Sequence, residues 1–296
     1  MKKTIFTGSA VAIVTPMHAD GSIHWDKLGA LIDWQIDNGT DAIVICGTTG
    51  EASTMTEAEH LECIRYAVER TAKRVPVIAG TGSNDTRTAI ELSQEAEKLG
   101  ADGLLLVTPY YNKTTQAGLI KHYTMIADSV NIPIILYNIP GRTGMGFTVD
   151  TLKVLAEHKN IVAVKEASGN ISYTAQVAAA VGDKMDIYSG NDDIIVPMMA
   201  LGAKGVISVL SNIIPKETHE MCQLCLDNNF APAIEMQLKY LEVINDLFIE
   251  VNPIPVKAAM NMMGMPAGSL RMPLVDMSEA NAAKLRDAMQ RAGILA

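Results

Sequence analysis

Eight short apolar runs alternate with longer stretches of helical periodicity, and this alternation constrains the fold more than any other feature of the chain. Each run has four to six apolar residues, is rich in Val and Ile, and is closed by Gly, Pro, Thr or Asn. The runs fall within residues 8–16, 41–51, 75–83, 102–112, 132–140, 160–169, 185–192 and 203–212. Strands buried on both faces have this pattern and belong to parallel sheets. Eight strand–helix units predict an α/β fold, a (β/α)8 TIM barrel, rather than an open doubly wound sheet.

The stretches between the runs have the spacing of amphipathic helices. In residues 86–100, the apolar side chains of Ala89, Leu92, Ala96 and Leu99 form one stripe, with a capping "SND" before it. An open dinucleotide-binding sheet would more often show a glycine fingerprint after its first strand, and "GTGSN" at 80–84 lacks the third glycine. After residue 228 only helical patterns remain. We therefore expect a barrel domain at 1–228 and a C-terminal helical domain at 229–296.

Charge and cysteine content exclude several classes of protein. The net charge of −9 and the lack of a basic run argue against a nucleic-acid-binding surface. No apolar run approaches the roughly 20 residues needed to cross a bilayer. Residues 1–21 begin like a secretory signal, but "TGS" interrupts the apolar stretch and no cleavage site follows. Cys222 and Cys225 form a CxxC near His219, yet no second pair completes a zinc set, so we expect reduced thiols and a cytoplasmic location.

Polar side chains follow the predicted strands at the end where a barrel carries its active site. The second, fourth, fifth, sixth and seventh strands end in "GTTGE", "TPYYN", "YNIPGRTG", "KEASG" and "SGND". Hydroxyl groups, backbone amides beside glycine, one arginine and one lysine should therefore meet at one mouth. The six histidines lie elsewhere and are never paired at metal spacing, which argues against a zinc-dependent enzyme.

Lys165 follows directly on the apolar run 161–164. Partial desolvation at a strand tip lowers the pKa of an amine, whereas at the ordinary pKa of about 10.4 only roughly one amine in 2,500 is neutral at pH 7. A neutral amine attacks carbonyl groups to form a Schiff base. The position of Lys165 alone does not decide between this role and two simpler ones, a salt bridge to Glu166 or a solvated lysine at the strand end.

Other charged residues near the predicted mouth have simpler interpretations. Lys257, in "NPIPVK", is a rival amine, but it lies in the helical extension and is expected to be an ordinary helix lysine. Asp192 and Asp193 resemble a carboxylate pair and are expected to cap the helix that follows them.

Several separated motifs agree in order and spacing with one known family. They are "FTGSAVAIVTP", "GTTGEASTM", "PVIAGTGSN", "TPYYNKTTQ", "YNIPGRTG", "VAVKEASGN" and "NPIPVK", which together run almost from end to end of the chain. The sequence resembles the dihydrodipicolinate synthase and N-acetylneuraminate lyase family of pyruvate-binding class I aldolases. The resemblance implies a lyase of lysine and diaminopimelate biosynthesis that condenses pyruvate with L-aspartate 4-semialdehyde. It also implies that no metal or organic cofactor is needed, since the imine itself accepts the electrons.

The resemblance implies four catalytic residues. Lys165 occupies the place of the lysine that condenses with pyruvate, and Tyr137 that of the tyrosine that shuttles protons beside it. Thr48 corresponds to the threonine whose hydroxyl links this tyrosine to a second one, here Tyr111. In the family the second tyrosine comes from a neighbouring subunit. The resemblance therefore implies a homo-oligomer, with a homotetramer built as a dimer of dimers as the expected form.

Substrate-binding groups follow from the same resemblance. The backbone amides of Thr48 and Thr49 offer a site for the pyruvate carboxylate, and glycine lets the chain approach it closely. Arg142 corresponds to the arginine that binds the carboxylate of the second substrate, for which its planar fork is suited. Backbone groups of Gly190 and Ile207 correspond to the lining of the pyruvate pocket.

A regulatory site for lysine is present in many relatives at a dimer interface. Residues matching it are Asn84, Tyr110 and His60, whereas Ala52, Glu57 and Thr88 stand where inhibited relatives usually have serine, histidine and glutamate. The loss of a carboxylate that faces the ligand should weaken binding of lysine's ammonium groups. We expect weak inhibition or none.

Two alternatives remain at the level of the sequence. One is another lyase on the same scaffold, which cleaves N-acetylneuraminate or 2-keto-3-deoxygluconate. "GTTGE" and the arginine of "PGRTG" favour condensation over that cleavage. The other is a barrel that binds a metabolite without catalysis, against which the joint presence of Lys165, Tyr137, Thr48, Tyr111 and Arg142 argues.

Overall fold

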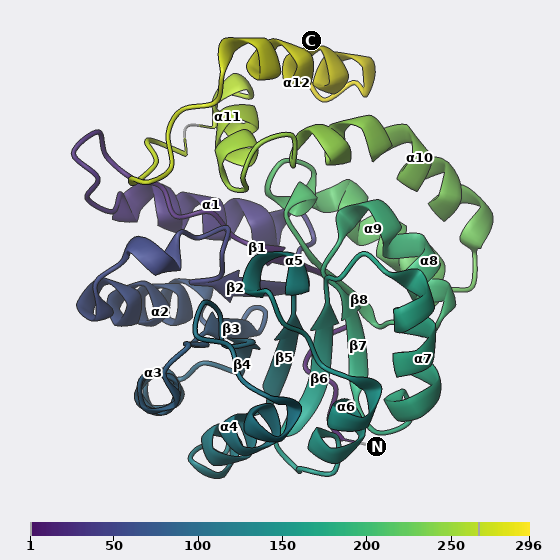
Figure 1. Ribbon diagram of the computed structural model, residues 1–296. Coiled ribbons are helices and arrows are strands. Elements are labelled where there is room, and N and C mark those ends of the chain that lie inside the picture. Colours follow the sequence, from purple (N-terminus) through teal and green to yellow (C-terminus); the bar gives the residue numbers. More distant parts are fainter. Residues whose placement is uncertain (1, 266) are drawn as a thin grey trace.

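The predicted barrel is confirmed. A computed structural model describes residues 2–265 and 267–296, and in it eight parallel strands close into a ring in chain order, with β1 paired to both β2 and β8 (Figure 1). The strands are β1 (Gly8–Ala12), β2 (Ala42–Ile45), β3 (Val77–Gly80), β4 (Gly103–Val107), β5 (Ile134–Asn138), β6 (Ile161–Glu166), β7 (Asp186–Ser189) and β8 (Gly205–Ser208). Each lies within one of the eight apolar runs.

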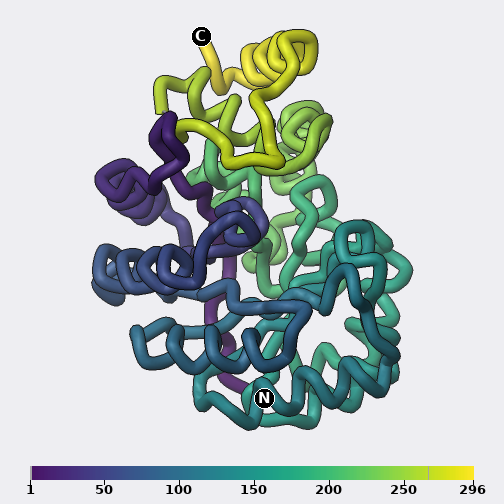
Figure 2. The backbone as a smooth tube through the Cα atoms, turned by 60° about the vertical axis from the view of Figure 1, so that its left-hand side comes forward, coloured from purple at the N-terminus to yellow at the C-terminus, as the bar shows by residue number. Residues whose placement is uncertain are grey.

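Helices surround the strands and continue beyond them (Figures 1 and 2). Those between strands are α1 (Trp25–Asp37), η1 (Ala52–Thr54), α2 (Glu57–Thr71), α3 (Thr86–Lys98), α4 (Gln116–Asp128), α5 (Pro140–Thr143), α6 (Val149–Leu155), α7 (Ile171–Val181), η2 (Asp192–Ile194) and α8 (Ile195–Ala200). After β8 come η3 (Leu210–Asn212), α9 (Pro215–Leu226), α10 (Phe230–Asp246), α11 (Ile254–Met262) and α12 (Glu279–Arg291). In Figure 1 the last helices lie above the end of the barrel toward which the strand arrows point.

Alternate residues of each strand feed two separate apolar cores. One fills the barrel interior and includes Ala10, Val44, Tyr137 and Ile207. The other lies between the strands and the surrounding helices. This double burial explains why the strands read as continuous apolar runs instead of alternating ones.

Helix α3 shows how local sequence fixes the elements between strands. Asp85 precedes the helix, and its side chain accepts a hydrogen bond from the backbone of Arg87. Ala89, Leu92 and Ala96 form its buried stripe, as the apolar spacing predicts. A side-chain cap of this kind satisfies a backbone amide that the helix itself leaves free.

Helix α10 attaches the C-terminal helices to the barrel. It packs against α8 and α9, while α12 packs against α10 and α11. Lys284 of α12 lies 2.8 Å from the buried carboxylate of Asp246 at the end of α10. Within the described parts of the chain, none of the helices combines the length and apolarity needed to span a membrane.

Two glycines allow the first and last strands to meet. Gly205 pairs with Gly8 across this seam and has a φ of +151°. A Cβ atom at Gly205 would lie 1.8 Å from the carbonyl oxygen of Gly8, a contact that only a shift of the backbone can relieve. Overpacking and strain each cost about 1–3 kcal/mol, so we expect Gly205→Ala to lower the free energy of unfolding by about 3 kcal/mol or more. Chemical denaturation measures this change.

Gly202 provides the matched control for Gly205. It also has a positive φ, +95°, but a Cβ atom there meets no other atom within 4 Å. Gly202→Ala should therefore cost only the strain of the backbone, about 1 kcal/mol. If both variants lost the same free energy of unfolding, the contact between the added Cβ atom and Gly8 would not be the cause of the loss in Gly205→Ala.

Candidate active site

The registers of neighbouring strands place the candidate catalytic residues Tyr137 and Lys165 side by side. Tyr137 on β5 pairs with Lys165 on β6, which in turn pairs with Tyr188 on β7. The Lys165 ammonium nitrogen lies 4.3 Å from the centre of the Tyr137 ring. Both side chains are buried at the carboxyl end of the barrel, where this fold carries its active sites.

Lys165 has the environment of a reactive amine. Its side chain is 6% exposed, and burial lowers its pKa to about 8. The negative charge of Asp192 acts against this shift, and the positive charge of Arg142 adds to it. Gly190 borders the same side chain, since a Cβ atom at Gly190 would lie 3.0 Å from Cε of Lys165. At pH 7 about one amine in eleven is then neutral.

The alternative salt bridge between Lys165 and Glu166 is not formed. Successive strand residues point to opposite faces, and Glu166 therefore faces away from the barrel interior. Its carboxylate accepts hydrogen bonds of 2.6 Å from the side-chain amide of Asn138 and from the backbone of Ser168. Burial raises the pKa of Glu166. The lysine amine thus remains available to a substrate.

Tyr137 is placed to exchange protons with its neighbours. Burial raises the pKa of its phenol to about 12, while the charge of Arg142 and a contact with the Thr48 hydroxyl act in the opposite direction. The phenol is therefore neutral at physiological pH and carries a proton that it can pass on. Thr48 itself is exposed at the mouth of the barrel.

The "GTTGE" loop is folded by its own backbone and by one hydroxyl. The amide of Gly50 donates to the carbonyl of Gly47 at 3.1 Å, and that of Glu51 donates to the carbonyl of Thr48 at the same distance. The Thr15 hydroxyl donates to the carbonyl of Gly50 at 2.8 Å. Thr48 and Thr49 thereby occupy the tip of a tight turn at the end of β2.

Asn252 joins two candidate binding groups and was missed by the sequence analysis. Its side-chain amide donates to the Thr49 hydroxyl at 3.0 Å, and its backbone carbonyl oxygen accepts from the Arg142 guanidinium at 3.3 Å. Arg142 lies in the short helix α5 directly after β5. In the sequence, its position at the start of the motif "NPIPVK" is the signal that could have indicated it.

Tyr111 differs from the other candidates, since it does not contact them within the chain. Its side chain is 93% exposed, and its φ of 66° is unusual for a bulky residue. By contrast, Ile207 is 1% exposed and belongs to the same interior cluster as Tyr137. The structure therefore assembles Lys165, Tyr137, Thr48, Thr49, Arg142, Gly190 and Ile207, and leaves Tyr111 pointing outward.

The expectation that Asp192 and Asp193 cap the next helix is wrong. One carboxylate oxygen of Asp192 accepts hydrogen bonds of 2.9 Å from the backbones of Val209 and Leu210, beyond β8. Its side chain is buried, which raises its pKa. Asp193 is exposed, and neither η2 nor α8 has a side-chain cap. The partners of Asp192 lie 17 and 18 residues away and could not be read from local spacing.

The expectation that Lys257 is an ordinary helix lysine is also wrong. Its side chain is 2% exposed, and its ammonium nitrogen lies 2.5 Å from a carboxylate oxygen of Glu51. Burial lowers the pKa of Lys257, whereas the charge of Glu51 raises it. An amine paired in this way is not a free nucleophile, so Lys165 has no rival there.

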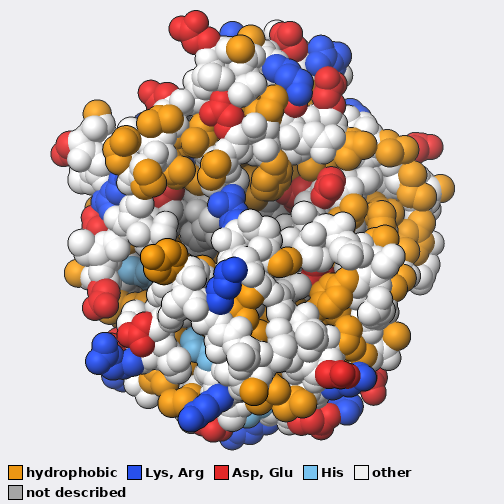
Figure 3. Space-filling model, in the orientation of Figure 1, with side chains coloured by type: hydrophobic (Ala, Val, Ile, Leu, Met, Phe, Trp, Pro, Cys, Tyr) orange, Lys and Arg blue, Asp and Glu red, His pale blue; other side chains and the backbone are white. Residues whose placement is uncertain are grey.

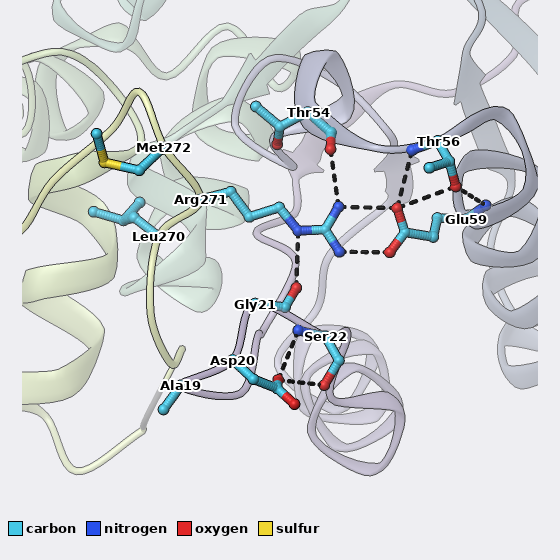
Figure 4. Close-up of a pocket in the computed structure, with 10 residues that line it drawn as sticks. All are labelled: Ala19, Asp20, Gly21, Ser22, Thr54, Thr56, Glu59, Leu270, Arg271 and Met272. Carbon is cyan, nitrogen blue, oxygen red and sulfur yellow. Dashed lines mark hydrogen bonds and ion pairs between the residues drawn. The ribbon is translucent and has the colours of Figure 1, made fainter.

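A cavity lies between the turn at residues 19–22, the end of η1 with the start of α2, and residues 270–272 before α12 (Figure 4). Arg271 crosses it and donates to both carboxylate oxygens of Glu59 and to the carbonyls of Gly21 and Thr54. With its donors engaged in this way, Arg271 connects its own segment to the turn at Gly21 and to the region from Thr54 to Glu59. The ion pair lowers the pKa of Glu59 to about 2.

The residues of the possible lysine site lie close to β3 and β4. The Asn84 side-chain amide donates to the carbonyl of Tyr110 at 3.2 Å. One ring nitrogen of His60 lies 2.7 Å from the carbonyl oxygen of Gly80, and burial lowers the pKa of His60. His60 is thus engaged within the chain, while Tyr110 is exposed.

The lowered pKa of Lys165 predicts how the rate of covalent capture depends on pH. Only the neutral amine attacks a keto group, so the rate should rise as pH rises toward the pKa of about 8 and level off above it. Stopped-flow or quenched measurements of pyruvate capture between pH 6 and 10 would detect this rise in rate. A midpoint near 10 would contradict the desolvation of the amine.

The fold and the site define a class of protein. A (β/α)8 barrel with a buried lysine of low pKa at the end of a strand, beside a tyrosine, is the arrangement of a lyase that acts through a Schiff base, the class I aldolase type. The model of the dihydrodipicolinate synthetase family matches residues 5–292. The chain belongs to this family.

Individual relatives are similar over nearly their whole length. A 4-hydroxy-tetrahydrodipicolinate synthase of Lachnoclostridium phytofermentans is 56% identical over 98% of this chain and 99% of its own. One of Acetivibrio thermocellus is 55% identical over 100% of both chains. The crystal structure of a dihydrodipicolinate synthase from Acinetobacter baumannii in complex with pyruvate has a TM-score of 0.96 at 47% identity, covering 99% of this chain and 100% of its own.

Proposed function

We propose that this protein condenses pyruvate with L-aspartate 4-semialdehyde to form 4-hydroxy-tetrahydrodipicolinate, as in the biosynthesis of diaminopimelate and lysine. The observation that carries the proposal is the buried amine of Lys165, with a pKa of about 8, beside Tyr137 at the mouth of the barrel. The names of the similar synthases support the same reaction.

The reaction begins with attack of the neutral Lys165 amine on the keto carbon of pyruvate. Loss of water gives a protonated imine, which withdraws electrons from the methyl carbon and allows it to lose a proton. The resulting enamine forms a carbon–carbon bond to the aldehyde of the second substrate, whose oxygen takes up a proton. The amine of that substrate then displaces Lys165, which closes the ring and frees the lysine.

Proton transfers accompany each of these steps, and we assign them to Tyr137 and Thr48. The backbone amides at Thr48 and Thr49 bind the carboxylate of pyruvate, while Arg142 binds that of the semialdehyde. Gly190 leaves room beside Lys165, because a Cβ atom at this position would press on the lysine side chain. The carbonyl of Ile207 lies at the edge of the same space in this proposal.

Tyr111 completes the proton path from a second subunit in this proposal. Its exposure and positive φ support the assignment, because such a side chain gains from burial against another chain. Further apolar side chains are exposed on α10 and just after α8, namely Ile234, Leu238 and Leu201. Apolar side chains also gather at the right-hand edge of Figure 3. The region around Tyr111 and the region at α8 and α10 suit two kinds of interface, so we propose a homotetramer. We also propose that the protein is located in the cytoplasm.

Borohydride trapping tests the proposed chemistry. The protein is incubated with pyruvate, reduced and digested, and the reduced adduct is expected on the peptide that contains Lys165. Pyruvate consumption is then followed with L-aspartate 4-semialdehyde, and N-acetylneuraminate cleavage is measured in parallel. An adduct on another peptide would refute the role of Lys165, and faster neuraminate cleavage would refute the choice of substrate.

Lysine is expected to inhibit the protein weakly or not at all. Asn84, Tyr110 and His60 are retained, but Thr88 stands where inhibited relatives usually have a carboxylate. A titration of the condensation rate with lysine measures the effect. Half-inhibition at sub-millimolar lysine would contradict the expectation.

A further inference from the structure

A buried ion pair connects the C-terminal helices to the loop that bears Thr48 and Thr49. Lys257 of α11 lies 2.5 Å from Glu51, and their side chains are 2% and 0% exposed. Lys257 also donates to the carbonyl of Ser269 at 2.8 Å. The mechanism above uses neither residue, and a buried pair of charges is weak evidence for a role in stability.

Glu51 is held in an unusual conformation as the last residue of the loop. Its φ of 58° lies in the left-handed region, which is uncommon for residues other than glycine. Its second carboxylate oxygen accepts a hydrogen bond of 3.0 Å from the backbone of Arg271. The Arg271 side chain is itself fixed by Glu59 (Figure 4). Both oxygens of Glu51 are therefore bound by the C-terminal segment.

Asn252 provides a second contact between the same segment and the loop. It precedes α11 and donates from its side chain to the hydroxyl of Thr49, one residue from Thr48 and two from Glu51. Asn252 and Lys257 therefore contact two of the four residues from Thr48 to Glu51, through side chains that are themselves buried.

We propose that Lys257, Glu51 and Asn252 are positioning residues for pyruvate capture: they fix the "GTTGE" loop so that its amides and the Thr48 hydroxyl face the Lys165 amine. The inference rests on the proposed function and assigns a role to the C-terminal domain, residues 229–296. A displacement of about 1 Å in such a group can cost on the order of 100-fold in rate. Its amides bind only pyruvate, and it takes part in the later steps only through the Thr48 hydroxyl, so the loss of kcat/KM should be larger for pyruvate than for the semialdehyde.

The decisive variant is the double substitution Glu51→Gln and Lys257→Met. Each single change leaves one buried charge without a partner and destabilises the fold, whereas the neutral pair removes both charges together. We expect its Tm to return close to that of the unaltered protein. The kcat/KM for pyruvate should nevertheless remain at least about tenfold lower, with kcat/KM for the semialdehyde within about threefold.

Asn252→Ala tests the same role without removing a charge. It should show the same selective loss of kcat/KM for pyruvate, so a double variant that does not fold still leaves the inference open to refutation. Normal pyruvate capture in a folded double variant would overturn the inference. If the double variant does not fold, normal pyruvate capture in Asn252→Ala would overturn it. The expected loss in the folded variants supports it.

Asp246→Asn is the matched control. It removes the buried carboxylate that pairs with Lys284 between α10 and α12, away from the loop. This variant should lose stability while both kcat/KM values stay within about twofold. A pyruvate-specific loss there as well would show that any damage to the C-terminal helices has the same effect, against a specific positioning role.

Amide hydrogen exchange separates this inference from the proposed function. Exchange at residues 48–51 should accelerate in the folded double variant even without substrate, because the loop has lost its fixed partners. Failure of unaltered protein to trap pyruvate on Lys165 would refute the proposed function, and the role in pyruvate capture with it. Unchanged exchange together with unchanged pyruvate capture would refute the positioning role only.

Discussion

Replacement of Lys165 by methionine is expected to abolish condensation and, at the same time, to stabilise the fold. Without an amine at the end of β6 no imine can form, and the loss of kcat should be at least about 1,000-fold, as for nucleophiles in other covalent enzymes. No pyruvate adduct should survive borohydride reduction. The rate assay and the mass of the intact protein measure both effects.

The gain in stability follows from the pKa of the amine. The folded protein holds Lys165 at a pKa of about 8, whereas the unfolded chain binds a proton there up to the ordinary lysine pKa. The unfolded state therefore binds more protons between these values, and the folded state bears a cost that is complete below about pH 8 and fades above it. The cost is of order 3 kcal/mol. Lys165→Met should remove it, with the largest gain below pH 8.

Lys153 offers the control for this variant. It is a half-exposed lysine on α6, paired with Asp150 at 3.0 Å on the surface. Lys153→Met should change neither the rate nor the unfolding free energy by a measurable amount, since exposed pairs contribute about 0–1 kcal/mol. A folded Lys165→Met protein that retained pyruvate capture would show that another amine performs the chemistry.

The barrel could be predicted from sequence because its physics is local and repeated. A strand buried on both faces must be apolar throughout, and the helix that follows must present one apolar stripe, as in residues 86–98. Eight repetitions leave little choice of topology. The active-site end follows from the same reasoning, since every parallel strand delivers its carboxyl end to one rim.

The two errors arose where a charged residue has its partner far along the chain. Lys257 has a helical neighbourhood, and nothing near it indicates Glu51, which lies more than 200 residues earlier. Asp192 precedes a helix and so resembles a cap, yet it accepts from amides beyond the next strand. In both cases a tertiary contact overrides the local pattern, because burying a charge demands a partner wherever one is available.

Asn252 illustrates a different limit. An asparagine before a proline is common in turns, so its sequence context predicts a turn and no more. Its role depends on a distance of 3.0 Å to Thr49, set by the packing of α11 against the end of the barrel. A resemblance to a family conveys residues whose roles are already assigned, whereas contacts of this kind become visible only in three dimensions.

Tyr137→Phe should separate proton transfer from covalent capture. The substitution removes the hydroxyl that contacts Thr48 and leaves the ring that packs beside Lys165. General acid–base catalysis contributes about 100- to 10,000-fold, and kcat should fall within that range. The adduct with pyruvate should still accumulate on Lys165 at equilibrium, only more slowly, in contrast to Lys165→Met.

Two further readouts identify the cause of the loss in Tyr137→Phe. The phenol has a pKa of about 12 and stays neutral throughout the assay range, so the rise in capture rate near pH 8, which belongs to Lys165, should persist. Tyr188→Phe is the matched control, because the Tyr188 hydroxyl donates to the carbonyl of Phe6 at 2.7 Å inside the barrel. That variant should lose about 1 kcal/mol of stability and retain its rate per folded molecule. If kcat of Tyr137→Phe stayed within about threefold of normal, the proton transfers would have to be assigned to Thr48 or to water.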